Sequence, residues 1–474
     1  MNKLYHEYVN CLLPRVGRAV PKLKPSFAIM TWPNGKPCSF VNFWLSDLSS
    51  STTGQTVKQY CVNITPLIRY CYDFKIDLID FCDADLNKLV GVVAKQRRSN
   101  GERQKQNNQV NAVIDAIILF YVWLRDVGSP RDFKQSIGDI AQSPNITVKS
   151  VKARFGRIGY EHESHMAPST DLHSKHPMPK SSISAIEDQI FLESDPDYYP
   201  GVARHKFRPS SGAVNAFQKY LFERRSFTVW MFRRTGLRPD ELCSMPLSDN
   251  LQVLKSKLLY IPTRKRRSDG LTLRPFKISS DAALTVCHYL SAREEYVRSL
   301  VAAECANSIG GVMLLTEDGN GLSAASLTRD FSRVVKRAGL SDVRACLSMF
   351  RHRFITMEIL LHLKEVFSDE KPTRALLSPP VIKSLEERIR KKTGHGLGTS
   401  IWTYFDAALD MINLWKDVDT AILNLGQLED IEDKMQRLKY DIRDSSIGNI
   451  VLTEQLQALQ KEVSAMQAKL ALGR

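Results

Sequence analysis

Apolar residues recur at helical spacing over much of the first 130 residues. From residue 36 onward they return every three or four positions, and Pro66 is expected to kink or divide one of the helices. The longest apolar run, Ala112 to Asp126, is too short to span a bilayer and carries Asp115, so the helix predicted from Gln106 to Asp126 is expected to be a buried core helix. The range 36–130 is therefore predicted to be one bundle of four or five short helices. Residues 1–35, with mixed charge and several prolines, form a separate N-terminal segment.

The periodic pattern decays between residues 131 and 203. Proline, serine, histidine and lysine dominate there, for example in "MAPSTDLHSKHPMPKSS", which favours a basic interdomain linker with at most one short helix. A linker this long is unusual inside a compact domain. A domain boundary is therefore predicted within it.

The range 204–410 mixes helices with one β element. The run "AFQKYLFERRSFTVWMFRRTG" predicts a helix that ends at Gly236, and a new helix begins at "RPDEL". In "KLLYIPTRKRRSDGLTLRPFKIS", apolar residues flank a polar turn with "SDG", which predicts a β-hairpin. Helical patterns follow it. The predicted fold class is mainly α with a small antiparallel β-sheet (α+β).

The last range, 411–474, repeats apolar residues three and four positions apart. This spacing is typical of a coiled coil or of a helical hairpin folded back on the chain. The residues that carry it are Ile431, Met435, Leu438, Ile442, Leu452, Leu456, Leu459, Val463, Met466 and Leu470.

The charge balance favours a polyanionic partner. The 474 residues contain 66 Lys plus Arg against 51 Asp plus Glu, a formal charge of +15, which points to nucleic acid or an anionic membrane surface. A polar, charged N-terminus and the lack of a spanning apolar run argue against a membrane partner, so a cytoplasmic, nucleoid-associated location is expected. The nine cysteines are scattered without a CxxC pair, which predicts reduced thiols and no zinc site.

Two arginines and one tyrosine stand in sequences that suit chemistry on a phosphodiester. Cleavage without a metal needs a nucleophile and several cations, and the planar fork of arginine can bind two phosphate oxygens. Arg238 lies in "TGLRPDEL", Arg351 lies in "SMFRHRFIT", and "TGHGLGTSIWTYF" places His395 nine positions before Tyr404.

Together these three segments resemble the catalytic boxes of the tyrosine recombinase, or phage integrase, family. "TGLRPDEL" resembles the first arginine box, "SMFRHRFIT" the second, and "TGHGLGTSIWTYF" the box with the nucleophilic tyrosine. Their order, separation and His-to-Tyr spacing agree with the family. The resemblance covers residues 200–410 and extends loosely to 40–130, which is similar to the core-binding domain of the family.

The resemblance implies a role for each matching residue. Arg238 and Arg351 would clamp the scissile phosphate and stabilise the charge of the transition state. Tyr404 would attack phosphorus to form a 3′-phosphotyrosyl link, with His395 bonding the phosphate or assisting proton transfer. Glu241 would brace the first box.

The family also places a lysine on a β-hairpin turn, where it protonates the leaving 5′ oxygen. Lys265 in "TRKRRSDG" is the best match, and Lys257, which precedes the first strand, is the weaker alternative. Arg266 in the same turn is not a candidate, because arginine does not readily give up a proton. The basic residues predicted to contact DNA are Arg264, Arg266, Arg267, Lys391 and Lys392.

This chain departs from the family pattern in two places. Ser348 stands where the family usually has a histidine or lysine, so acid–base work would fall to Lys265 and His395. The stretch between the second and third boxes is also longer than expected. His352, between Phe350 and Phe354, is predicted to pack, with catalysis as the less favoured alternative.

The resemblance implies a site-specific DNA recombinase, the integrase of a mobile element, that cleaves and rejoins double-stranded DNA. Four protomers would assemble on two DNA sites, with element-encoded accessory proteins as further partners. No cofactor and no metal are expected, since the covalent link conserves the energy of the broken bond and the sequence has no GxxxxGK[ST] loop. The alternatives are a catalytically silent DNA-binding or scaffolding protein of the same fold and a type IB topoisomerase-like strand nicker.

Overall fold

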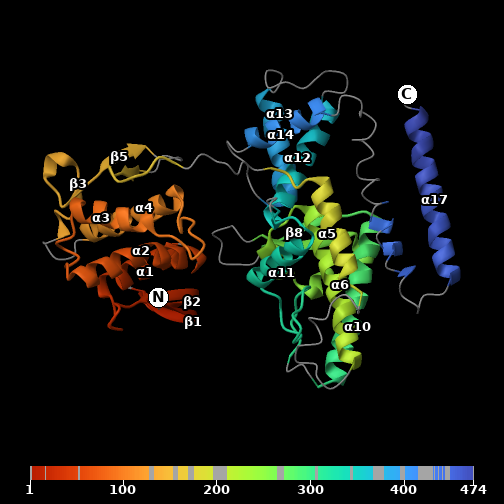
Figure 1. Cartoon of the computed structure of the whole chain (residues 1–474), viewed down its shortest axis with the longest axis horizontal. Helices are drawn as coiled ribbons and strands as arrows, with labels where there is room; N and C mark the ends of the chain where they lie inside the picture. The colour runs from red at the N-terminus through yellow and green to blue at the C-terminus, as the bar shows by residue number, and fades with distance from the viewer. Residues whose placement is uncertain are drawn as a thin grey trace. The chain divides into compact units, whose positions relative to one another are not determined.

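The chain forms two compact units, Met1–Leu172 and His173–Arg474, each described separately. The computed structural model (Figure 1) describes residues 3–15, 18–51, 54–127, 133–152, 158–168, 176–195, 211–263, 272–304, 308–341, 345–366, 378–394, 401–414, 431–442 except 432, 436 and 440, and 449–472.

The first unit combines a β-hairpin with four helices. The helices are α1 (Ser39–Ser51), α2 (Gly54–Phe74), α3 (Asp83–Lys95) and α4 (Asn107–Asp126). They confirm the predicted bundle, and α2 continues through Pro66 rather than being divided by it. The apolar helix α4 is the most buried of them, with Ile114, Ile117 and Phe120 each fully enclosed.

The N-terminal segment, for which no helix or strand was predicted, is a hairpin of two long strands. Strand β1 (Tyr5–Arg15) pairs antiparallel with β2 (Arg18–Met30), with an irregularity between Leu13 and Arg15. Both strands contain prolines. In a two-stranded ribbon both strands are edges, and an edge strand tolerates a residue without an N–H donor. Leu4, Ala28 and Met30 pack into the helical core.

The structure differs from the linker prediction over 131–203. Residues 133–168 carry short paired strands, β3 (Ile137–Gly138) with β4 (Ile146–Thr147) and β5 (Lys149–Lys152) with β6 (Ile158–Glu161), and the 3-10 turn η2 (Ile140–Gln142). Phe133, Ile137 and Ile146 enter the core of the first unit. Isolated apolar residues in a polar stretch gave no periodic signal, although these three are buried.

Helix α5 (Lys180–Leu192), also within the predicted linker, belongs to the second unit. It packs with α6 (Ser211–Thr235), α10 (Ser280–Ala302) and α11 (Ala324–Arg337) around one apolar core. Short helices α7 (Pro239–Cys243), α8 (Leu247–Asn250) and α9 (Val253–Ser256) lead into strand β7 (Leu258–Thr263). The predicted hairpin is confirmed, because β7 pairs antiparallel with β8 (Thr272–Lys277). Its turn, residues 264–271, lies outside the described residues.

A second apolar cluster of this unit joins α12 (Leu347–Val366), α13 (Pro379–Thr393) and α14 (Ile401–Leu414). In Figure 1 these three helices lie together at one end of the unit. Helix α13 occupies part of the long stretch between the second and third boxes. The fold class is therefore mainly α with small antiparallel sheets, as predicted.

The C-terminal range is helical where it is described. Short helical stretches lie within 431–442, and α17 (Asn449–Leu472) is a single long helix. Ile431 and Leu438 are buried, whereas Met435, Ile442 and Leu456 are exposed. The coiled coil stays a prediction. Within the described part of the chain, no helix is both long and apolar enough to cross a membrane.

Candidate active site

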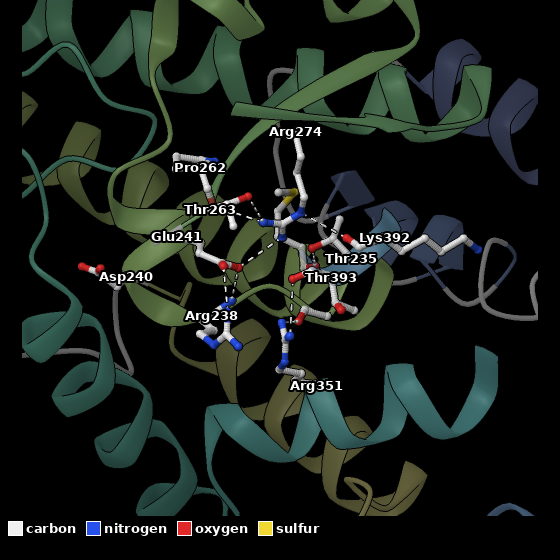
Figure 2. Close-up of polar contacts among 12 residues, drawn as sticks. Thr235, Arg238, Asp240, Glu241, Pro262, Thr263, Arg274, Arg351, Lys392 and Thr393 are labelled. Atoms are coloured by element: carbon white, nitrogen blue, oxygen red, sulfur yellow. Dashed lines mark hydrogen bonds and ion pairs between the residues drawn. The ribbon is translucent and has the colours of Figure 1, made fainter. Parts of the chain in front are cut away.

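A buried carboxylate, that of Glu241, holds together two arginines from different elements. Glu241 lies in α7 with no exposed surface. Its Oε1 accepts a hydrogen bond from Arg238 Nη1 at 3.0 Å, and its Oε2 accepts from the Arg238 backbone N–H at 3.0 Å and from Arg274 Nη2 at 3.1 Å. Figure 2 shows the carboxylate between the two guanidinium groups. Arg238 is the residue immediately before α7, and Pro239 starts the helix, so the local sequence fixes this geometry.

Arg274, on strand β8, uses its donors on the protein itself. Besides Glu241, its Nε donates to the Lys392 carbonyl at 3.1 Å and its Nη1 donates to the Pro262 carbonyl at 3.2 Å and to Thr263 Oγ1 at 3.3 Å. It therefore ties the hairpin, α7 and the end of α13 to one another. Arg274 was not among the predicted site residues; the only signal in the sequence is an arginine within the strand pattern "LTLRPFKI".

Arg351, on α12, is held by two backbone carbonyls. Its Nη1 donates to the Gly236 carbonyl at 2.7 Å and its Nη2 donates to the Thr393 carbonyl at 3.4 Å (Figure 2). Each of these nitrogens carries a second hydrogen. The side chain is nearly enclosed, so the two contacts fix its direction while leaving donors for an anion.

The backbone at Gly236 needs glycine for two reasons. Its φ is +57°, a conformation that L-residues rarely adopt. A Cβ there would also lie 2.4 Å from Cδ1 of Phe354. The turn that ends α6 therefore brings the Gly236 carbonyl to Arg351 and, two residues later, brings Arg238 into the same site.

Tyr404, on α14, is buried with only 5% of its surface exposed, and its hydroxyl is hydrogen-bonded to His352. The Tyr404 Oη lies 2.9 Å from His352 Nδ1, and the two ring centroids are 5.6 Å apart. His352 was expected to pack between phenylalanines. Instead it contacts the candidate nucleophile.

Burial and the crowding of cations shift the pKa values of this site. Burial, reinforced by Arg238 and Arg274, lowers the pKa of Arg351 to about 10, still high enough to keep it charged at neutral pH. Burial raises the pKa of Tyr404, and the nearby Arg351 and Arg238 oppose that rise. Three guanidinium groups around one carboxylate leave an excess of positive charge, which an anion such as phosphate would balance.

The structure brings Arg238, Glu241, Arg351, His352 and Tyr404 together. Ser348 is exposed, and its Oγ lies 3.1 Å from Cys346 Sγ. The predicted residues Arg264, Lys265, Arg266, Arg267 and His395 lie outside the described residues. Lys257 is placed after α9 with a left-handed backbone, where its N–H caps that helix.

The two predicted DNA-contacting lysines at the end of α13 differ in their surroundings. Lys391 is exposed. The Lys392 ammonium donates to both oxygens of the buried Glu358 at 2.7 Å, and in Figure 2 its side chain points away from the arginine cluster. DNA binding by Lys392 stays a prediction, and it would require this ion pair to open.

This arrangement can bind a tetrahedral anion and present a phenol to it. Arg238 and Arg351 offer a planar, charged set of donors, which suits phosphate. Among the described residues, no group of three or more His, Cys, Asp or Glu lies where it could hold a metal ion.

No protein-family model and no curated protein matches the chain. Solved structures similar to it include XerH site-specific recombinase in a post-cleavage complex with a palindromic difH substrate (12% identity, 78% of this chain, 81% of that chain, TM-score 0.43). A lambda integrase dimer bound to a COC′ core site is 14% identical; the match covers 78% of this chain and 77% of that chain, with a TM-score of 0.41. The Tn1549 transposon integrase in complex with circular intermediate DNA is 14% identical; the match covers 71% of this chain and 86% of that chain, with a TM-score of 0.36. Because these values are low, the chemistry is derived from this chain's own side chains.

Proposed function

We propose that this protein is a tyrosine-type site-specific DNA recombinase that cleaves and rejoins DNA through a 3′-phosphotyrosyl intermediate. The observation that carries the proposal is the buried Tyr404 hydroxyl in the electrostatic field of Arg351 and Arg238, both oriented by the protein. A phenol and two preorganised guanidinium groups are what in-line attack on a phosphodiester requires.

In the proposed reaction, Arg238 and Arg351 hold the non-bridging oxygens of the scissile phosphate. Tyr404 Oη forms the bond to phosphorus, and the bond from phosphorus to the 5′ oxygen breaks. The leaving oxygen takes a proton from Lys265, and rejoining reverses these steps. Double-stranded DNA is the substrate, consistent with the formal charge of +15. Integration or excision of a mobile element by four protomers on two sites is the biological role proposed.

The experiment that tests this uses nicked suicide duplexes tiled across the genomic DNA on both sides of the gene for this protein. A nick just beyond the scissile phosphate releases a short strand and traps the covalent complex. The wild-type protein is expected to give protein-linked DNA that resists denaturation by detergent, and Tyr404→Phe is expected to give none. Tyr260→Phe, which removes a half-buried hydroxyl on β7, is the matched control and should form the adduct normally.

The result separates the proposal from its alternatives. Adducts only on particular duplexes, followed by recombinant products from two such duplexes, support a recombinase. Adducts on all sequences, with relaxation of supercoiled plasmid, indicate a topoisomerase-like nicker. DNA binding without any adduct, in the wild type as in Tyr404→Phe, contradicts the enzyme and leaves a catalytically silent binding protein.

A further inference from the structure

The contact between His352 and Tyr404 joins two helices that are far apart in the sequence. His352 lies in α12 and Tyr404 in α14, 52 positions later, and their side chains meet at 2.9 Å between Nδ1 and Oη. Tyr404 itself belongs to the second apolar cluster, and Phe354, two residues after His352, is also buried in it. The packing of α12 against α14 therefore sets this distance.

A buried phenol needs an acceptor for its proton before it can attack phosphorus. Burial keeps the pKa of Tyr404 above its ordinary value despite Arg351 and Arg238, so the hydroxyl stays protonated at neutral pH. Ser348 cannot supply the acceptor from an exposed position bonded to Cys346. An imidazole nitrogen at hydrogen-bonding distance is the group that can.

We propose that His352 is the general base of DNA cleavage, a role that rests on the proposed function. As Tyr404 Oη forms its bond to phosphorus, the phenolic proton passes to His352 Nδ1. The imidazolium that results is stabilised by the phosphate charge held between Arg238 and Arg351. When the 5′ hydroxyl attacks the phosphotyrosine, the same imidazolium returns the proton to the leaving phenolate.

The charges around the pair set the direction of the pH dependence. Arg351 on the same helix and Arg238 at the start of α7 both act on Tyr404 and stay charged through neutral pH. Imidazole is the side-chain type that ordinarily gains or loses a proton near neutral pH. Cleavage by the wild type is therefore expected to fall at acidic pH, because a protonated imidazole can no longer accept the phenolic proton.

The test measures the single-turnover rate of adduct formation between pH 5 and 9, on a nicked duplex that gives adducts with the wild type. His352→Asn places an amide oxygen near the former Nδ1, so it can still accept a hydrogen bond from Tyr404 but cannot take its proton. We expect its rate to be lower by about 10²-fold or more and to lack the loss at acidic pH that the wild type shows. His288→Asn, at an exposed position on α10, is the matched control and should behave as wild type.

Each outcome decides the role. A rate and pH profile of His352→Asn equal to those of the wild type overturn the role of His352 and leave the proposed function intact. A slow variant that keeps the acid limb also overturns it, because the titrating base is then another group, such as His395. Free imidazole added to His352→Ala should raise the rate of adduct formation by this variant at least 10-fold. A purely structural role of His352 would not allow such a rescue. If the wild type forms no adduct, the proposed function fails and this step fails with it.

Discussion

At the scale of single residues, Glu241 is the residue on which the site geometry depends most. It is fully buried and carries one negative charge against Arg238 and Arg274. A buried ion pair contributes little net stability compared with an apolar pair, because desolvation offsets the attraction. What it provides is direction: each oxygen has a specified donor, so the Arg238 guanidinium is held in one orientation.

Glu241→Gln should therefore cost more than its small change in shape suggests. The amide nitrogen would face an arginine and leave buried positive charge without its partner, so we expect a loss of about 3 kcal/mol in the free energy of unfolding. Adduct formation should fall by about 10²-fold because Arg238 loses its orientation. Calorimetry of the whole chain and the suicide-substrate assay measure the two effects. Asp240→Asn changes the exposed carboxylate next to it and should alter stability by less than about 0.5 kcal/mol; equal effects of the two changes would contradict the role of Glu241.

The sequence identified the residues whose local context is distinctive, but not the contacts between elements. Arg238, Glu241 and Arg351 stand in short segments with recognisable spacing, and Gly236 marked a helix end. Arg274 had no such segment, and its role depends on the carbonyls of Pro262 and Lys392, which only the folded chain brings to it. His352 was predicted to pack because its sequence neighbours are aromatic. Its contact with Tyr404 is set by helix packing, to which no local pattern refers.

At the scale of elements, the C-terminal end of α13 completes the site. Its last two carbonyls, those of Lys392 and Thr393, accept from Arg274 and Arg351. The left-handed Gly394 that follows lets this end approach Thr263 of β7, where a Cβ would lie 3.0 Å from the Thr263 methyl. The helix is fixed to α12 through the buried Glu358, which binds Lys392 and Arg388.

Glu358→Gln should loosen α13. Through the carbonyls at the end of this helix, it should also loosen Arg274 and Arg351. The variant leaves Lys392 and Arg388 without their buried carboxylate, so we expect faster amide hydrogen exchange over residues 385–393 and adduct formation reduced by about 10-fold. Glu365→Gln removes the other carboxylate bound to Arg388, but that carboxylate is 58% exposed, and such pairs contribute about 0–1 kcal/mol. Exchange at α13 should then be unchanged. If both variants match the wild type, α13 is held by its apolar contacts alone.

The elements that the sequence predicted well are those with sustained periodicity. Helices α4 and α6 and the hairpin of β7 and β8 follow the predicted ranges closely. Strands β1 and β2 were not predicted, because prolines and charged residues interrupt the apolar–polar alternation that would indicate a strand. The strands of residues 133–161 were missed because they bury single apolar residues and pair over only two to four positions.

At the scale of the whole second unit, residues 431–442, here called the tail segment, lie against α5, α6 and α10. Asp433 accepts from Arg233 at 2.9 Å and from Arg234 at 3.3 Å, which lie three and two residues before Gly236. Ile431 and Leu438 are also buried. The segment also borders a cavity of about 280 Å³ lined by Phe227, Trp230 and His288. The tail segment is therefore held by charge as well as by apolar packing.

The strongest test of this contact is the pair of Arg437 with Glu223. Glu223 is nearly fully buried on α6; burial raises its pKa, and Arg437 opposes that rise. Arg437→Met removes the guanidinium, which should raise the pKa of Glu223 further and cost the docked state about 3 kcal/mol while the carboxylate is charged.

The expected result is faster amide hydrogen exchange over 431–442 at pH 8. An acid whose folded pKa is raised binds more protons when folded, so docking strengthens as the pH falls. Exchange in Arg437→Met, corrected for intrinsic rates, should therefore return toward the wild-type value at pH 5. Lys439→Met removes a cation 4.0 Å from Asp188 in a pair of exposed side chains, and it should change docking by less than about 0.5 kcal/mol at either pH. Protection in Arg437→Met that is independent of pH would mean that the apolar contacts of Ile431 and Leu438 hold the segment without help from charge.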